Sequence, residues 1–274
     1  MSKGISLHIG LNKVDPKHYG GPQTLAGCEN DAKAMEKLAK AQGFTPLRLL
    51  SKQATSTVVL DAITKAATEL VAGDAFFITY AGHGGQVPDT NGDEDDKWDE
   101  TWCLYDRELV DDELAAAWSK FAAGVRIIML SDSCHSGSVS RLANRPGTPS
   151  VGKKGKRYRL LPPDVNMRTY RHNKALYDGI QEKFRAGNKV KIKASVLLIS
   201  GCQDNQLSQD GDKNGLFTET MLEVWDSGSF NGGYVSFHKE VVSFMPPDQT
   251  PNYSVIGKKS ASFEKQKPFT LATP

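Results

Sequence analysis

Two residues of the sequence, a histidine and a cysteine, have the type and surroundings needed for nucleophilic catalysis. His83 lies in the run GHGG, directly after the apolar stretch AFFITYA. Cys134 lies in the run DSCHSG, directly after the apolar stretch VRIIMLS. Glycine in such runs lets a substrate backbone come close and leaves backbone amides free to point at it. Because an imidazole can take the proton of a thiol, the two residues are a candidate cysteine–histidine dyad.

The alternative interpretation is that both residues are structural, as a single His or Cys more often is. Two of them, each after an apolar strand and among small residues, favour catalysis instead. His135 is a second candidate base, but it is adjacent to the cysteine. Side chains of adjacent residues in an extended chain point to opposite faces, so His135 cannot easily reach the sulfur. We therefore expect His83 to be the base.

The elements that must position these residues alternate between apolar strands and amphipathic helices. This pattern is typical of an α/β domain with a mainly parallel sheet. In such a sheet, ligands bind beyond the carboxyl ends of the strands, which is where GHGG, DSCHSG and a third run, SGCQDNQ, are found. The expected strands are residues 5–11, 46–50, 75–81, 125–131 and 194–200, and the expected helices are residues 30–42, 55–70, 111–121 and 217–225.

Composition restricts the class of protein further. The chain has 274 residues, with 34 Lys and Arg against 32 Asp and Glu, and a formal net charge of +2. This balance gives no argument for binding nucleic acid or a membrane surface, and we expect neither as a partner. No apolar run approaches the length of a membrane span, and the first residues predict a strand rather than a secretion signal.

The cysteines indicate the compartment. There are four, Cys28, Cys103, Cys134 and Cys202, widely spaced and without a CxxC pair. A disulfide framework or a structural zinc site is therefore not expected, and a reducing cytoplasm is the simplest location.

Several motifs carry a resemblance to one family of peptidases. They follow one another as LAGCENDAKAM (25–35), YAGHG (80–84), VDDEL (110–114), SDSCHSG (131–137) and ISGCQDNQLSQD (199–210). Together they resemble the metacaspases, including the prokaryotic orthocaspases. A histidine about 50 residues before the cysteine also matches the caspase pattern. DSCHSG stands where animal caspases carry QACRG, which separates this chain from them.

The resemblance implies the fold and the reaction. The fold would be a caspase-like three-layer αβα sandwich with a central, mostly parallel six-stranded sheet. The reaction would be that of a cysteine endopeptidase cleaving after Arg or Lys through a thioester, with His83 and Cys134 as the dyad. The backbone amides of Gly84 and Cys134 would stabilise the oxyanion.

The resemblance also assigns the specificity pocket. Asp31 and Asp132 match its two acids, and paired carboxylates suit a guanidinium or an ammonium group. Asp31 has an alternative role, since it could simply cap the helix that starts there. Cys28 matches a cysteine that lines the pocket. Ala81 stands where the family often has serine, so one polar contact of the pocket is missing here.

Calcium is a further implication of the resemblance. Asp99, Asp111 and Asp112 match three of the family's calcium ligands, but Arg141 replaces the fourth, an aspartate. Because affinity for a hard cation follows ligand charge, we expect no cofactor to be required, with the guanidinium standing in for the ion. The run DTNGDEDDKWDE (89–100) resembles an EF-hand loop, but its glycine, Gly92, is not at the position of the sharp turn. We interpret it as a solvated loop.

A basic segment, residues 141–171, interrupts the single domain expected over residues 1–274. It is either a solvated insertion, a cover over the site, or a place where an Arg/Lys-specific peptidase cleaves itself. The candidates for self-cleavage are KKGKR (153–157), Arg141, Arg145, Arg159, Arg168 and Arg171.

Two other functions are compatible with the sequence. One is a non-catalytic caspase-like interaction module, which the intact His83, Cys134, Asp31 and Asp132 disfavour. The other is a calcium-binding signalling domain, which the misplaced Gly92 and the lack of a second loop disfavour. For the peptidase we expect protein or peptide substrates with Arg or Lys at the cleaved bond, and a monomer.

Overall fold

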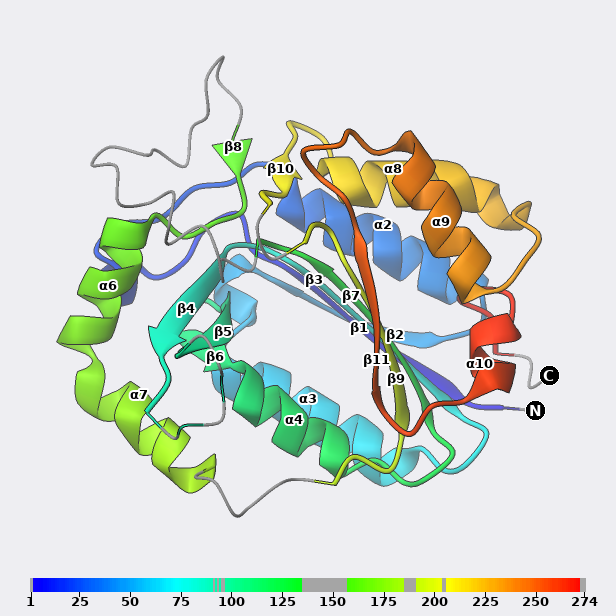
Figure 1. Cartoon of the computed structure of the whole chain (residues 1–274), viewed down its shortest axis with the longest axis horizontal. Coiled ribbons are helices and arrows are strands. Elements are labelled where there is room, and N and C mark those ends of the chain that lie inside the picture. The colour runs from blue at the N-terminus through cyan, green and yellow to red at the C-terminus, as the bar shows by residue number, and fades with distance from the viewer. Residues whose placement is uncertain are drawn as a thin grey trace.

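A mostly parallel sheet of six strands, ordered β11-β9-β7-β3-β1-β2, forms the centre of the molecule (Figure 1). The structure is a computed structural model of the chain, and it describes residues 2–90, 92, 94, 97–134, 157–184, 191–203 and 206–271. Five of the six strands run parallel, and β11 pairs antiparallel with β9. The sheet strands are β1 (Gly4–Gly10), β2 (Thr45–Leu50), β3 (Ala75–Ala81), β7 (Arg126–Asp132), β9 (Ser195–Ser200) and β11 (Asn252–Gly257).

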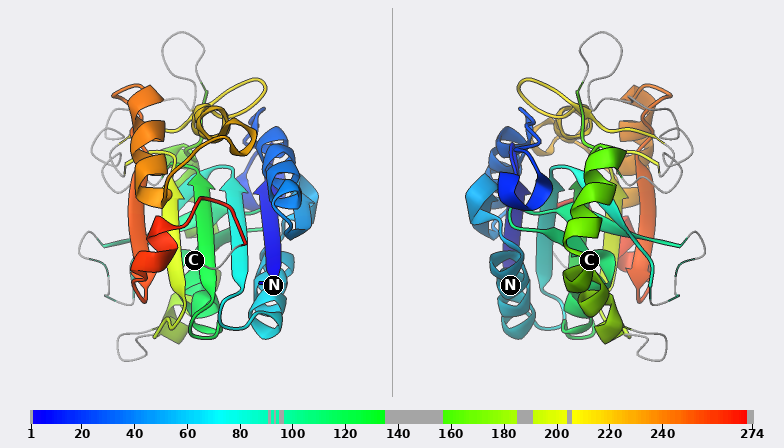
Figure 2. Two further views of the ribbon diagram at one scale, coloured as in Figure 1. Left: turned by 90° about the vertical axis from the view of Figure 1, so that its right-hand side faces the viewer. Right: turned by 90° about the vertical axis from the view of Figure 1, so that its left-hand side faces the viewer.

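Helices cover both faces of this sheet, which makes three layers (Figures 1 and 2). One face packs against α2 (Cys28–Ala41), α8 (Leu216–Trp225) and α9 (Tyr234–Phe244) through a core that includes Phe77 and Leu130. The other packs against α3 (Ser56–Glu69) and α4 (Asp111–Ser119) through a core that includes Phe76 and Met129. Since successive side chains of a strand point to opposite faces, apolar strands supply both cores. The predicted three-layer αβα sandwich with a mostly parallel six-stranded sheet is confirmed (Figure 1).

The remaining elements lie at the carboxyl edge of the sheet and around it. A small antiparallel sheet is formed by β4 (Gly84–Pro88), β5 (Trp98–Cys103) and β6 (Glu108–Val110), and a two-stranded one by β8 (Arg157–Tyr158) and β10 (Gln209–Asp210). None of these five strands was predicted. The other helices are α1 (Pro16–Tyr19), α6 (Pro163–His172), α7 (Lys174–Gln181) and α10 (Ala261–Lys265), with 3-10 turns at Ser51–Gln53, Glu182–Phe184 and Asp226–Gly228.

The basic segment predicted as an insertion at residues 141–171 is regular in its described part. Residues 157–171 contain β8 and most of α6, which packs beside β4 in Figure 1. The rest of that segment, with Arg141, lies outside the described residues, as does His135. Among the described helices, none combines the length and the apolar character needed to span a bilayer.

Candidate active site

The register of the central sheet brings His83 and Cys134 to the same edge. In the parallel pair of β3 and β7, Ala81 lies opposite Asp132. His83 and Cys134 each come two residues after that pair, beyond the carboxyl ends of neighbouring strands. The predicted position of the dyad residues at one edge of the sheet therefore agrees with the structure.

His83 is held in an orientation that suits a base. Its Nε2 lies 2.9 Å from the carbonyl oxygen of Gln23, a contact in which the ring nitrogen must donate. This fixes the proton on Nε2 and leaves Nδ1 with a lone pair. Within the described residues, Nδ1 has no hydrogen-bond partner. Burial lowers the pKa of His83 to about 4, so the imidazole is neutral at physiological pH and can accept a proton.

Tyr80 positions the backbone of the histidine. Its hydroxyl donates a hydrogen bond of 2.6 Å to the carbonyl oxygen of His83, and its ring stacks on Trp102 with centroids 4.5 Å apart. Both aromatic side chains are buried. A stacked pair of this kind fixes the turn that carries His83, and sequence reasoning did not identify it.

Cys134 is completely buried and lies beside the strand that precedes α8. The backbone N–H of Ser208 donates to its Sγ at 2.8 Å. The sulfur is the atom that acts as the nucleophile in cysteine catalysis, and this donor fixes its position. Leu160 and Cys202 pack around the Cys134 side chain in a small cluster of their own.

Two backbone amides at this site converge on one carbonyl oxygen. The N–H groups of Gly84 and Cys134 donate to the carbonyl oxygen of Arg159 at 2.9 and 3.1 Å. These are the two amides that the sequence resemblance assigned to oxyanion stabilisation. A Cβ on Gly84 would lie 1.9 Å from the carbonyl oxygen of Cys134, so only glycine allows this approach.

The side chain of the same arginine fills a pocket of three carboxylates. Its Nη2 lies 2.5 Å from Asp31 and 3.2 Å from Asp210, and its Nη1 lies 2.8 Å from Asp132. All four side chains are at least 97% buried. Burial alone would lower the pKa of Arg159, but the carboxylates outweigh it and raise that pKa well above its usual value. The two predicted pocket acids therefore bind one guanidinium, as paired carboxylates should.

The carboxylate of Asp31 accepts hydrogen bonds from the loop before α8. Its Oδ1 accepts one hydrogen bond from the Nδ2 of Asn214 at 2.8 Å and one from the backbone N–H of Gly215 at 3.1 Å. Burial raises the pKa of Asp31 to about 6, against the lowering effect of Arg159. Asp31 lies in the first turn of α2, yet its side-chain contacts are with the pocket rather than with its own helix.

The carboxylate of Asp132 is fixed from two sides. The Ser208 hydroxyl donates to its Oδ1 at 2.7 Å, and the hydroxyl of Thr218 donates to its Oδ2 at 2.6 Å. The backbone N–H of Thr218 adds a third bond to Oδ2 at 3.2 Å. These donors hold the carboxylate towards the guanidinium and compensate in part for its burial.

Asp210 is the pocket acid that sequence reasoning missed. It accepts the backbone N–H groups of Ala26 and Gly27 at 2.7 and 3.1 Å, and the Sγ of Cys28 lies 3.9 Å from it. Cys28 thus lies beside the pocket, as the resemblance implied, and packs with Leu25 and Ala81. The run SQD of the last motif was the only signal for Asp210, and the carboxylate reaches the site through the pairing of β8 with β10.

The chain around Arg159 crosses the site as an extended peptide would. Before it, β8 pairs antiparallel with β10, and the N–H of Arg159 donates to the carbonyl oxygen of Ser208 at 3.0 Å. After it, Leu160 forms a bridge with Gly84, and the Leu161 N–H donates to the Gly84 carbonyl oxygen at 2.8 Å. The carbonyl group of the Arg159–Leu160 peptide bond therefore faces the amides of Gly84 and Cys134.

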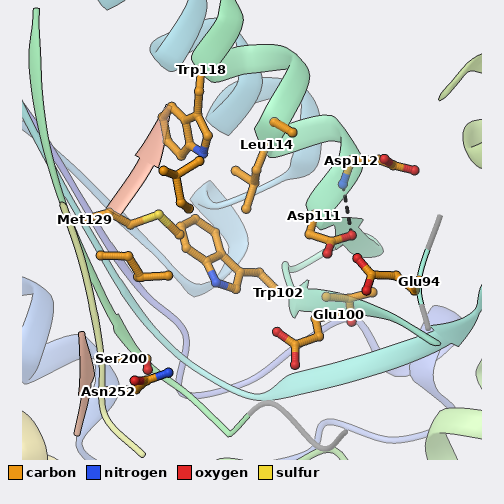
Figure 3. A pocket seen from close by; sticks show the side chains of 14 residues that line it. Glu94, Glu100, Trp102, Asp111, Asp112, Leu114, Trp118, Met129, Ser200 and Asn252 are labelled. Atoms are coloured by element: carbon orange, nitrogen blue, oxygen red, sulfur yellow. Dashed lines mark hydrogen bonds between the residues drawn. The ribbon is translucent and has the colours of Figure 1, made fainter. Parts of the chain in front are cut away.

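The calcium candidates lie away from this pocket, at an acidic cavity of about 340 Å³ (Figure 3). Asp111 and Asp112, at the start of α4, line its mouth, and the floor is apolar, with Trp102 and Trp118. Asp99 is buried on β5 nearby. Burial and the neighbouring carboxylates, Asp99 first among them, raise the pKa of Asp111 to about 8. Among the described residues, however, no three acidic, His or Cys side chains converge as metal ligands.

Comparisons with known proteins place most of the chain in one family. The model of the caspase-domain family matches residues 4–269. Metacaspase-1 of Schizosaccharomyces pombe is 29% identical over 251 residues, covering 80% of this chain and 58% of that protein. Metacaspase-1A of Neurospora crassa is 31% identical over 236 residues, covering 75% and 51%. The chain thus spans a little over half the length of these curated relatives.

The solved structures that are similar to the chain include one bacterial protein and one caspase. The crystal structure of protein GSU0716 from Geobacter sulfurreducens has a TM-score of 0.89 and 54% identity, and the match covers 98% of this chain and 99% of that one. Caspase-1 from Spodoptera frugiperda has a TM-score of 0.56 at 12% identity, covering 93% and 86%. The second likeness supports the fold alone, and it confirms the predicted caspase-like sandwich.

Proposed function

Since the chain belongs to the caspase-domain family, we propose that it is a cysteine endopeptidase that cleaves peptide bonds after Arg or Lys, with His83 and Cys134 as its dyad. One observation carries the proposal: Arg159 occupies the site in the manner of a substrate residue. Its carbonyl oxygen accepts two amides, and its guanidinium binds three carboxylates.

The reaction proceeds through a thioester. His83 takes the proton of the Cys134 thiol, and the sulfur attacks the carbonyl carbon of the residue in the pocket. The oxyanion that forms accepts the N–H groups of Gly84 and Cys134, which are already in place. The imidazolium then gives its proton to the departing amine, so the peptide bond breaks and a thioester remains. Water, deprotonated by the same imidazole, hydrolyses the thioester and frees the thiol.

The pocket accounts for the specificity. A buried cluster of Asp31, Asp132 and Asp210 is stable only with a cation against it, because isolated buried carboxylates are costly. A guanidinium satisfies the cluster with several hydrogen bonds, and the ammonium of Lys supplies one compact charge. An acidic side chain in this pocket would face three carboxylates, so cleavage after Asp is excluded by like-charge repulsion.

Self-cleavage belongs to the same proposal. Of the arginines in the basic segment, Arg159 is the one that the described contacts bring into the pocket. The bond it presents is Arg159–Leu160, and cutting it would give fragments of residues 1–159 and 160–274. The fragments would remain together, because β7 and β9 pair along their length in the sheet. Until it is cut or displaced, this segment also covers the pocket.

We assign this peptidase to the prokaryotic, orthocaspase type, and we expect a cytoplasmic monomer acting on protein or peptide substrates with Arg or Lys at the cleaved bond. All four cysteines are buried and unbridged, which fits a reducing compartment.

A comparison of three fluorogenic peptides, ending in Arg, Lys and Asp, tests the proposed activity. The purified full chain is expected to cleave the Arg and Lys peptides and to leave the Asp peptide intact. Cleavage of the Asp peptide alone would contradict the specificity. If none of the three is cleaved, the chain is a non-catalytic relative and the proposal is wrong.

The pH dependence should report Asp31. Its pKa is about 6 with Arg159 in the pocket, where burial raises it and the guanidinium lowers it. The ionised carboxylate binds the cation, so affinity for Arg peptides is expected to fall as the pH is lowered through about 6, where Asp31 becomes protonated. Measured kcat and KM should show a rise in KM over this range that is absent in Asp31→Asn.

We also propose that catalysis needs no calcium, because Arg141 stands where the resemblance places an aspartate ligand. Adding EGTA should change the rate of Arg-peptide cleavage by less than about twofold. Loss of activity on chelation, restored by calcium, would contradict this. Asp111→Asn serves as a second check, since it should leave the EGTA response unchanged.

A further inference from the structure

The segment that carries Arg159 contacts the site on both sides of the pocket, not only within it. Arg157 precedes the pocket residue by two positions, and Leu160 follows it directly. Although β8 ends at Tyr158, the side chains of Arg157 and Arg159 both contact Asp210. The contacts of these flanking residues define further subsites, if the activity proposed above holds.

Arg157, two positions before Arg159, forms ion pairs with two aspartates. The Nε of Arg157 lies 3.4 Å from the Oδ2 of Asp210, and its Nη2 lies 2.5 Å from the Oδ1 of Asp212. Asp210 therefore binds Arg159 through one oxygen and Arg157 through the other. Asp210 is fully buried, whereas Asp212 is exposed, so the buried carboxylate is the stronger partner.

Leu160, directly after the bond that would be cleaved, packs against an apolar surface. Leu160 is 7% exposed and packs with the buried Cys134 and Cys202, with Leu207 half-buried against them. This cluster is separate from the main cores of the molecule, so the burial of Leu160 is a contact of the site. An aliphatic side chain fits here, and a charged one would lose its water without gaining a partner.

We propose that the enzyme recognises an extended sequence in its substrates: a basic residue, any residue, then Arg or Lys, with cleavage before an aliphatic residue. Asp210 and Asp212 form the subsite for the first basic residue, and Cys202 and Leu207 form the subsite for the aliphatic one. The segment 157–160 is the intramolecular example of this sequence.

Internally quenched peptides test this inference on the full-length enzyme. The parent peptide is RYRLLP, the sequence of residues 157–162. Replacing its leucine after the cleaved bond with Asp is expected to lower kcat/KM by about tenfold or more, as expected for loss of a buried aliphatic contact. Replacing its first arginine with Gln is expected to lower kcat/KM about threefold, since that pair is partly exposed. Cys134→Ala provides the blank.

Two variants assign the preferences to their residues. Asp212→Asn should reduce the preference for Arg over Gln at the first position without changing the preference at the cleaved bond. Leu207→Lys should remove or reverse the preference for Leu over Asp after the cleaved bond, because the lysine supplies a cation to pair with the acid.

The outcomes separate this inference from the proposed activity. If all peptides with Arg at the cleaved bond are cut equally well, the activity stands and the extended recognition is wrong. If none of the peptides is cut, both are wrong. A preference that Leu207→Lys leaves unchanged would show that the aliphatic subsite lies elsewhere and would overturn its assignment.

Discussion

Replacing Cys134 with alanine is expected to lower the hydrolysis of Arg peptides by a factor on the order of 10⁴ or more, because the thioester can no longer form. The backbone N–H of residue 134 that binds the Arg159 carbonyl oxygen is retained, and only one sulfur is removed from a buried cluster. The variant should therefore fold and still bind substrate. Rates measured with a fluorogenic Arg peptide on folded protein check this.

The matched control for this substitution is Cys103→Ala. Cys103 is equally buried, but its side chain lies in the main core rather than in the site. The substitution leaves a cavity and lowers stability, so the rate of this variant is measured below its unfolding temperature. At that temperature its rate of Arg-peptide hydrolysis should stay close to the rate of the wild type. If Cys134→Ala hydrolyses the Arg peptide as fast as Cys103→Ala does, the nucleophile is another residue.

Replacing Asp132 with asparagine is expected to lower kcat/KM for Arg peptides by about 10²-fold to 10³-fold, the effect of removing one partner of a buried ion pair. The asparagine would keep the shape of the side chain but would place an amide where the guanidinium needs an acceptor. Ser208 and Thr218 already donate to this carboxylate, so the amide NH₂ group would face a donor on either side. Comparing peptides that end in Arg and in neutral citrulline measures the effect.

The loss should be confined to the charged substrate. In Asp132→Asn the ratio of rates for Arg and citrulline peptides is expected to fall steeply. Asp74→Asn is the control, since Asp74 is another buried carboxylate, placed just before β3 at the opposite end of the strands. An equal loss for both peptides in Asp132→Asn would mean that the residue supports the structure of the site and not its specificity.

Much of the site could be predicted because its residues directly follow apolar strands. The alternation of strands and helices predicts which runs end at the same edge of a parallel sheet, and that brings His83 and Cys134 together. Asp31 and Asp132 were assigned to the pocket by the resemblance of their motifs to those of the metacaspases. The apolar pattern alone indicates five of the sheet strands, and the sixth was expected only because the resemblance implies a six-stranded sheet.

What could not be predicted depends on contacts between segments that are distant in the chain. Asp210 belongs to a polar run in which nothing distinguishes it, and only the pairing of two-residue strands brings it to the pocket. Arg159 was one arginine among several, and its role follows from contacts with Asp31, 128 residues before it. The short strands β4 to β6 contain glycine and charged residues, so their sequence has little of the apolar pattern that reveals a core strand.

The central claim is that Arg159 is bound as a substrate residue, and the intact mass of incubated protein tests it most directly. The wild-type chain should yield two fragments, residues 1–159 and 160–274, with a new N-terminus beginning Leu160, Leu161 and Pro162. Cys134→Ala should keep its full mass, and Arg159→Gln should remain uncut at that bond. Cleavage at another arginine or lysine with the Arg159–Leu160 bond intact, or wild-type protein that stays whole, would contradict the account.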